Sequence, residues 1–379
     1  MPIGTEEYRQ RLADIRARMA ARALDAVIVY SWKRGQVRYV AGYAPNYVAN
    51  VAAVVVPLEG EPSMYIRFPF DLERAQRMCW FADVRASGDV NAIGGDVAGD
   101  LRRRGVGDGA RVGLVTGDGV MDEMPYTLYR QLTADLPGVA FVDARDLVMD
   151  VRRVKSPAEF ALLRRSAQVA DAAVESRVGG DGAGRGRVRR RGRRRRRGAF
   201  CGRDDVAAGD CAPGQPGADR PPDHQALPGD DITIFELAVE VDGYWTQVAR
   251  AFAPGAPTRA QQAIYRAVYE AYQAEVEACR PGAPFGAIAQ AAERVLEAHS
   301  FGAHSEHDYG HGIGLDLPEP PRIGVDDADT VEAGMVIVLH PAVRVPGVGG
   351  AFIGGTVLVH EDRAEAIHAI PAELPHASA

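Results

Sequence analysis

The chain has 379 residues, of which 46% are hydrophobic, 25% charged and only 7% aromatic, as in soluble globular proteins. A single core stops growing near about 250–300 residues, so this length predicts two domains and excludes a fibrous or wholly disordered chain. The formal net charge of −7 argues against a nucleic-acid partner, provided that the charges are evenly spread.

The cysteines and the N-terminal segment indicate a compartment. Cys79, Cys201, Cys211 and Cys279 are far apart and form neither a disulfide framework nor a CxxC metal motif. The first twenty residues carry charges where a signal peptide needs an apolar segment, and no apolar run is long enough to span a membrane. We therefore expect a cytoplasmic protein with no membrane partner.

Residues 1–150 predict a compact α/β domain. Tyr8, Leu12, Ile15 and Met19 recur at helical spacing and share one face of a first amphipathic helix. Strand-like apolar runs follow at 26–30, 51–57, 64–68, 110–116 and 139–144.

A second domain, over residues 151–379, begins at a helix start signal. Ser156 is the expected N-cap, Pro157 the first helical residue and Glu159 the partner of the cap in a capping box. After Gly229 the pattern predicts two strands joined by a turn at Asp242-Gly243, helices over 258–279 and 285–299, and strands over 335–343 and 351–360. The class expected for this domain is α+β.

Between these signals, residues 177–228 have a different composition. They contain 13 Arg, 6 Asp and 11 Gly with few large apolar side chains, and ten of the thirteen residues in 185–197 are arginine. Such a segment cannot bury enough apolar surface to offset the entropy lost on ordering. We therefore treat 177–228 as an anomalous insert.

Four polar residues stand within or beside apolar strand segments of the second domain. Glu236 follows ITIF, His311 lies in YGHGIG, Glu319 lies in LPEPP, and His340 ends VIVL. A buried carboxylate or imidazole costs several kcal/mol unless it is paired or coordinated, so these residues are candidates for a site.

Five segments in order carry a resemblance to a known family: VRRVKSPAEFALLRRSAQVADAA, GDDITIFELAVEVDGYWTQVAR, GHGIGLDLPEPPRI, VEAGMVIVLHPAV and GVGGAFIGGTVLV. They resemble the motifs of the creatinase, prolidase and Xaa-Pro aminopeptidase (M24) superfamily. The resemblance implies a creatinase-like N-terminal domain, a catalytic domain with the pita-bread fold, and a homodimer.

The resemblance also implies ligand positions, and the residues that occupy them here depart from the family. Its metallopeptidases hold two divalent ions with two Asp, one His and two Glu. At the Asp positions this chain has Glu236 and Gln247, the His position is His311, and the two late Glu positions are His340 and Gly354.

Charge arithmetic decides against the pair of ions. One carboxylate, two imidazoles and an amide would leave two divalent cations with about three uncompensated positive charges in a partly dry cavity. We therefore expect degenerate metal ligands and no two-metal centre.

Two alternatives remain for the chemistry. In the first, as in creatinase, no metal takes part: His311 or His340 transfers the proton, Glu236 and Glu319 orient a cationic or amide-bearing substrate, and Gln247 and Arg250 contribute to substrate binding. In the second, Glu236, His311 and His340 hold one divalent ion at most, Zn, Fe or Mn. Glu236 paired with Arg250 across the hairpin is the structural alternative to a role in either site.

The predicted function is hydrolysis of a C–N bond in a small amidino, amide or dipeptide substrate, as by creatinase or an Xaa-Pro peptidase. The alternative is an inactive pita-bread protein that binds a small molecule or a protein. The arginine run 185–197 would bring a nucleic-acid partner if it is a genuine basic arm; it could also be a linker. As a third reading, 177–228 is a reading-frame artefact, since the family places a helix and a strand there.

Overall fold

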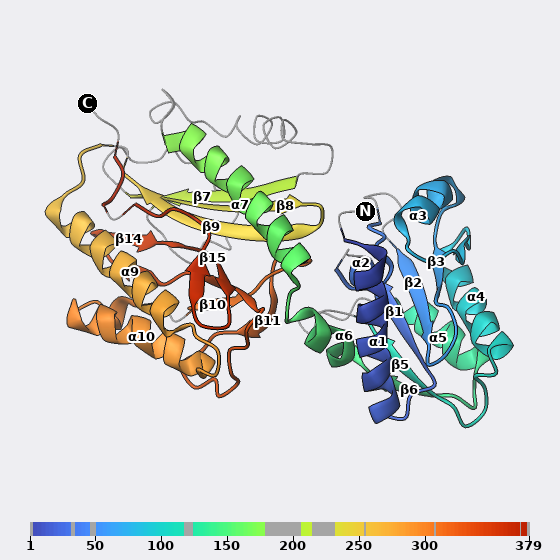
Figure 1. Cartoon of the computed structure of the whole chain (residues 1–379). Coiled ribbons are helices and arrows are strands. Elements are labelled where there is room, and N and C mark those ends of the chain that lie inside the picture. Colours follow the sequence, from blue (N-terminus) through green and yellow to red (C-terminus); the bar gives the residue numbers. More distant parts are fainter. Residues whose placement is uncertain are drawn as a thin grey trace. The chain divides into compact units, whose positions relative to one another are not determined.

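The computed structural model describes residues 3–31, 35–45, 51–116, 124–178, 206–213, 232–253, 255–306, 308–371 and 373–376. The chain divides into two compact units, Met1–Arg153 and Val154–Ala379, each with its own sheet (Figure 1). No helix in these described ranges is long and apolar enough to cross a membrane.

The first unit is an α/β domain built on a six-stranded sheet of order β4-β3-β2-β1-β5-β6. Its strands are β1 (Ala26–Ser31), β2 (Ala52–Pro57), β3 (Ser63–Ile66), β4 (Val84–Ala86), β5 (Arg111–Val115) and β6 (Ala140–Asp143). Its helices are α1 (Thr5–Ala21), α2 (Gly35–Ala41), the 3₁₀ turn η1 (Pro69–Asp71), α3 (Leu72–Met78), α4 (Val90–Arg103), α5 (Tyr126–Asp135) and α6 (Arg145–Arg152). The expected first helix is confirmed, with Tyr8, Leu12, Ile15 and Met19 buried on one face.

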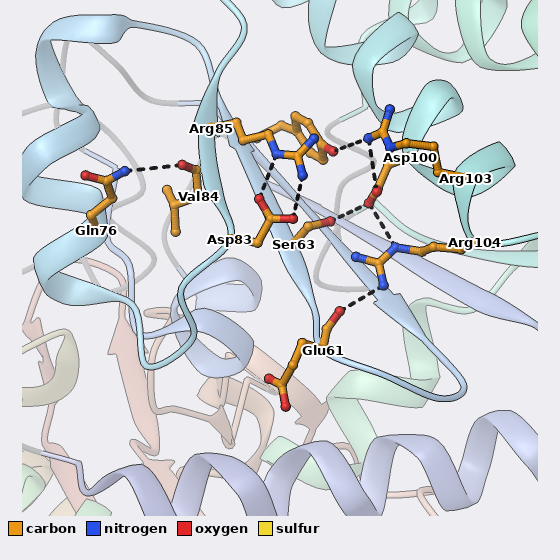
Figure 2. Close-up of polar contacts among 10 residues, drawn as sticks. Glu61, Ser63, Gln76, Asp83, Val84, Arg85, Asp100, Arg103 and Arg104 are labelled. Atoms are coloured by element: carbon orange, nitrogen blue, oxygen red, sulfur yellow. Dashed lines mark hydrogen bonds and ion pairs between the residues drawn. The ribbon is translucent and has the colours of Figure 1, made fainter.

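A buried carboxylate fastens α4 to this sheet. Asp100 accepts hydrogen bonds from Ser63 Oγ (2.5 Å), Arg104 Nε (3.1 Å) and Arg103 Nη2 (3.2 Å), as Figure 2 shows. Burial alone would raise the pKa of Asp100, but the hydrogen bonds from Ser63 and Arg104 outweigh it and hold that pKa below its usual value. Asp100 therefore remains ionised and paired.

The second unit is α+β, with a sheet of order β11-β10-β12-β15-β9-β8-β7 and β16 paired with β15; β13 and β14 pair separately. Its strands are β7 (Val206–Pro213), β8 (Thr233–Val241), β9 (Tyr244–Phe252), β10 (Gly310–Gly312), β11 (Glu319–Arg322), β12 (Val336–Leu339), β13 (Ala342–Val345), β14 (Gly349–Phe352), β15 (Gly354–Val359) and β16 (Ala364–Ala366). Its helices are α7 (Pro157–Val178), α9 (Arg259–Ala278), α10 (Phe285–Ala298) and the 3₁₀ turn η3 (Gly302–His304).

The start of α7 is confirmed at the expected capping box. The backbone N–H of Glu159 donates to Ser156 Oγ (3.2 Å), and the Glu159 carboxylate accepts from the backbone N–H of Ser156 (2.9 Å). The helix runs along β8 and β9 (Figure 1), where its apolar side chains pack against Phe235 and Val248. This packing fixes α7 on one face of the sheet.

The structure differs from the expectation for part of the segment 177–228. Residues 206–213 form β7, which pairs antiparallel with β8 over its whole length, from Val206 opposite Glu240 to Pro213 opposite Thr233. Backbone pairing with a strand edge needs no large apolar side chains, which is why composition did not indicate this strand. The arginine run 185–197 lies outside the described residues.

Candidate active site

The sheet of the second unit brings three of the expected ligand positions onto one face. Glu236 on β8 lies opposite Ala249 on β9, and Ala249 lies opposite Gly354 on β15. Residues directly opposite each other share a face, and so do residues two apart along a strand. Gln247 therefore joins Glu236 and Gly354 on this surface, which we call the site face.

Both expected histidines lie on the site face as well. His311 on β10 lies opposite Val338 on β12, which lies opposite Thr356, two residues after Gly354. His340 directly follows β12, and its ring centroid is 5.4 Å from that of His311. Four of the five positions that the family resemblance assigned thus lie on β8, β9, β10 and β15, and the fifth directly follows β12, all on the site face.

The two imidazoles are buried and differ in their partners. His311 Nδ1 lies 2.8 Å from the carbonyl oxygen of Gly312, which can only accept, so Nδ1 carries the proton and Nε2 the lone pair. Burial and the neighbouring His340 lower the pKa of His311 to about 4, so it is neutral at pH 7. His340 is 3% exposed, and its Nδ1 has no hydrogen-bond partner in the described part of the chain.

The carboxylate of the site is held by an amide. Gln247 Nε2 donates to Glu236 Oε1, and Glu236 is half-buried. The backbone of Gln247 is fixed in turn by Thr356, whose hydroxyl accepts from its N–H (3.0 Å) and donates to its carbonyl (3.1 Å). Gln247 is buried and orients Glu236. It is therefore not an ordinary polar strand residue that points into solvent.

The residues present do not fit the two-metal centre of the family. Gly354 supplies no ligand, and a Cβ atom there would lie 2.1 Å from Leu339 O and 2.6 Å from His340 Cα. Glu236 is the one carboxylate at the five ligand positions. Within the described ranges no group of three or more His, Cys, Asp or Glu side chains is disposed to hold a metal ion, so Glu236, His311 and His340 do not form such a group.

Two further candidates have other contacts. Glu319 Oε2 lies 3.0 Å from Lys155 Nζ, and both side chains are buried. Arg250 is next to Ala249 and so points to the face opposite the site, where it donates to the carbonyl oxygens of Ala249, Gly354 and Ala369. The pairing of Arg250 is with backbone, and Glu236 lies opposite Ala249 instead.

Sequence reasoning missed a pair formed by a buried histidine and a carboxylate. His368 Nδ1 lies 2.8 Å from Asp171 Oδ1, and the His368 side chain is fully buried. A signal was present: His368 stands in the apolar run AIHAI, as His340 does in VIVLHPAV. Asp171 gave no signal, because it occupies an ordinary polar position of α7.

Comparisons with known proteins bear on both units. Residues 11–154 match the creatinase/prolidase N-terminal domain, and residues 188–361 match metallopeptidase family M24. A putative dipeptidase, YkvY of Bacillus subtilis (strain 168), is 29% identical over 258 residues, which are 67% of this chain and 70% of that protein.

Solved structures show the same two-domain fold. The prolidase from Pyrococcus horikoshii OT3 superposes with a TM-score of 0.81 at 21% identity, covering 96% of this chain and 99% of that one. The N-terminal domain of FACT complex subunit SPT16 from Cicer arietinum (chickpea) superposes with a TM-score of 0.77 at 15% identity, covering 99% and 100%. The expected creatinase-like domain followed by a pita-bread domain is confirmed.

Proposed function

We propose a function from the premise that this chain belongs to the creatinase and prolidase superfamily of metallopeptidase family M24. It is a hydrolase that cleaves a C–N bond of a small amidino, amide or dipeptide substrate without the two-metal centre of the family. The observation that carries this proposal is the pair of adjacent buried imidazoles, His311 and His340, with Glu236 as the one carboxylate among the five ligand positions.

The imidazoles supply a route for the proton. A water molecule attacks the carbon of the C–N bond and gives its proton to an imidazole nitrogen; the C–N bond then breaks, and the same proton passes to the departing nitrogen. Two nitrogens can make this transfer: His340 Nδ1, which has no hydrogen-bond partner among the described residues, and His311 Nε2, which carries the lone pair because Nδ1 donates to Gly312. Glu236, held by Gln247, orients a cationic or N–H-bearing group of the substrate.

The relatives support hydrolysis, and one neighbour supports the alternative. The name of the Bacillus subtilis relative gives a dipeptidase, whose reaction breaks a C–N bond. The SPT16 domain has this fold within a subunit of a complex, so the fold by itself does not imply a hydrolase. An inactive pita-bread binding module is therefore the second candidate.

The test combines metal analysis with turnover. We expect the purified protein to hydrolyse at least one member of a panel of creatine, related amidino compounds and dipeptides ending in proline, with a rate unchanged by a chelator. Replacement of a general acid–base group costs about 10²–10⁴-fold in rate, so His340→Gln should lower kcat by that range. His299→Gln, at a half-buried histidine paired with Glu270 on α9, is the matched control and should retain full activity.

Three outcomes would contradict the proposal. The first is the finding of two tightly bound metal ions per chain. The second is turnover that a chelator abolishes and a divalent metal restores, because catalysis would then depend on a metal. Ligand-induced thermal stabilisation without any turnover would favour the binding module.

The assembly and the compartment belong to the same proposal. The family resemblance favours a cytoplasmic homodimer with a dipeptide or other small-molecule substrate. Light scattering on the purified chain should give twice its mass of 40.7 kDa, and a monomer would overturn this part.

A further inference from the structure

The residues behind the site face form a second buried polar cluster. His368 lies shortly after β16, and the carboxylate of Asp171 on α7 accepts the proton of its Nδ1 at 2.8 Å. Burial lowers the pKa of His368, against the opposing effect of Asp171, so the ring is neutral near pH 7. Asp171 thereby fixes both the tautomer and the orientation of this ring.

Two glycines separate this ring from the candidate active site. A Cβ atom on Gly355 would lie 3.0 Å from His368 Cδ2, whereas a Cβ atom on Gly354 would lie 2.6 Å from His340 Cβ. Successive residues of a strand point to opposite faces, so His368 and His340 contact opposite faces of the same short stretch of β15. With no side chain at 354 or 355, only backbone separates these contacts.

Arg250 ties the same backbone to the segment that carries His368. Its guanidinium donates to Gly354 O at 2.9 Å and to Ala369 O at 2.8 Å, and its side chain is buried. The N–H of Ile367 also donates to Thr356 O (3.1 Å). Of the residues on either side of His368, Ile367 is therefore hydrogen-bonded directly to Thr356, and Ala369 is linked to Gly354 through Arg250.

The carboxylate end of the cluster is fixed by α7. Ser166 Oγ, on the same helix as Asp171, donates to Val239 O on β8 at 2.7 Å. Ala170 and Val174, next to Asp171 in the helix, are buried against the same sheet. Asp171 thus presents its carboxylate from a helix that is anchored to the sheet.

We propose that Asp171 and His368 are positioning residues for His340: they hold the backbone of Gly354 and Gly355 from behind, and that backbone sets the place of the His340 ring. The catalytic meaning of this role rests on the proposed function. The physical claim, that the two faces of β15 are coupled, does not depend on turnover. A displacement of His368 changes the surface against which His340 packs, because the glycines offer no side chain to absorb it.

The test follows the ring signals of His340 in two-bond ¹H–¹⁵N correlation spectra of the histidine-labelled full chain. His340→Gln identifies those signals by their loss. We expect Asp171→Ala and His368→Ala to shift the His340 signals while the far-UV circular dichroism stays unchanged. His368→Asn, whose amide can still donate to Asp171, should return the signals most of the way to their original positions.

The control removes a similar pair elsewhere. His299 Nε2 lies 2.7 Å from Glu270 Oε2, and His299→Ala should leave the His340 signals unmoved. Unchanged His340 signals in both Asp171→Ala and His368→Ala would overturn the proposal. If an alanine variant fails to fold, Asp171→Leu and His368→Leu, which also remove this hydrogen bond, are compared with the original protein and decide it by the same criterion.

Kinetics separates this inference from the proposed function. Where a substrate is turned over, loss of a residue that orients a site group costs about 10–100-fold. We expect this loss in kcat for Asp171→Ala, with little change in KM. If no substrate is turned over by the original protein, the proposed function fails, while the spectra still test the coupling.

Discussion

Single buried residues in this protein are explained by their immediate partners. Lys155 and Glu319 form an ion pair whose side chains are 3% and 1% exposed, and the second Glu319 oxygen accepts from the N–H of Asp316 (3.1 Å). Gly314 leaves room for them, because a Cβ atom there would lie 2.9 Å from Lys155 Cε and from Glu319 Oε1. Removing one partner of such a pair costs much stability, because the remaining charge stays buried without its partner.

Lys155→Met is therefore expected to lower the free energy of unfolding by about 3–5 kcal/mol. Urea unfolding measures this loss, and Arg266→Met, at the exposed Arg266–Glu270 pair, should cost less than about 1 kcal/mol. Glu319→Gln should destabilise the protein in the same way as Lys155→Met. Loss of turnover in Glu319→Gln at unchanged stability would instead support the catalytic role expected from the sequence.

We expect that exchanging ligands does not restore the family's metal centre, because of the backbone packed around Gly354. The space for a Cβ atom at 354 is filled by Leu339 O and by the Cα of His340, both of which are backbone atoms. Removing the His340 imidazole would not clear them. At the two late positions where the family has Glu, this chain has His340 and Gly354. The backbone at these two positions also lies close together.

We expect Gly354→Ala to destabilise the protein by about 1–3 kcal/mol or more, the usual cost of overpacking. Gly324→Ala, where nothing lies within 4 Å, is the control and should change stability by less than about 0.5 kcal/mol. Gly354→Glu combined with His340→Glu should gain no metal in elemental analysis. A stable double variant with two bound ions would contradict this account.

At the scale of elements, α7 is the helix that organises the second unit. Arg164 on α7 donates to both carboxylate oxygens of Glu365 on β16, at 2.5 and 2.7 Å, and His360 Nε2 lies 2.7 Å from one of them. The hydrogen bonds from Arg164, and more weakly those from His360, outweigh burial and lower the pKa of Glu365 to about 2.

This pKa predicts a specific pH dependence. Because the pKa of Glu365 is depressed from 4.5, its contribution to stability is complete above about pH 4.5 and is lost as the pH falls toward about 2. Glu365→Gln should therefore cost up to about 1 kcal/mol at pH 7, since the pair is partly exposed, and progressively less below pH 4.5. Urea unfolding of both proteins at several pH values measures this difference in the free energy of unfolding. Glu361→Gln, at an exposed position, is the control and should show no such difference. A difference that grew on acidification would contradict the assignment.

At the scale of the whole molecule, charge is distributed unevenly. Residues 177–228 carry 13 Arg against 6 Asp, while the complete chain has a net charge of −7. The rest of the chain is therefore distinctly acidic. The segment 177–228 therefore differs from the remaining residues in net charge as well as in composition.

The reading-frame hypothesis for this segment stays a prediction. We expect another frame of the encoding DNA between the codons for residues 174 and 229 to yield an amphipathic helix and a strand, because the family places both there. Resequencing and retranslation of the gene measure this directly. If neither other frame gives such a pattern, the segment is genuine, and the arginine run then becomes a candidate basic arm with salt-dependent binding.

The sequence by itself determined the class of each domain and many of its elements. Helical spacing marked α1, the capping box marked the start of α7, and the ordered motifs indicated the two-domain fold, because these signals depend on neighbours within a few residues. It also singled out Glu236, His311, Glu319 and His340 as candidates for a site, since polar residues in apolar strands stand out locally, and this assignment stays a prediction.

Only the tertiary structure decided how those residues are partnered. Register placed Glu236, Gln247 and Gly354 on one face and Arg250 on the other, and it paired Glu319 with Lys155 across 164 positions of sequence. Asp171 and His368 came together in the same way, 197 positions apart. Such contacts depend on strand order and helix docking, which no local spacing records, and they determine which polar residues lie on the site face and which support the sheet behind it.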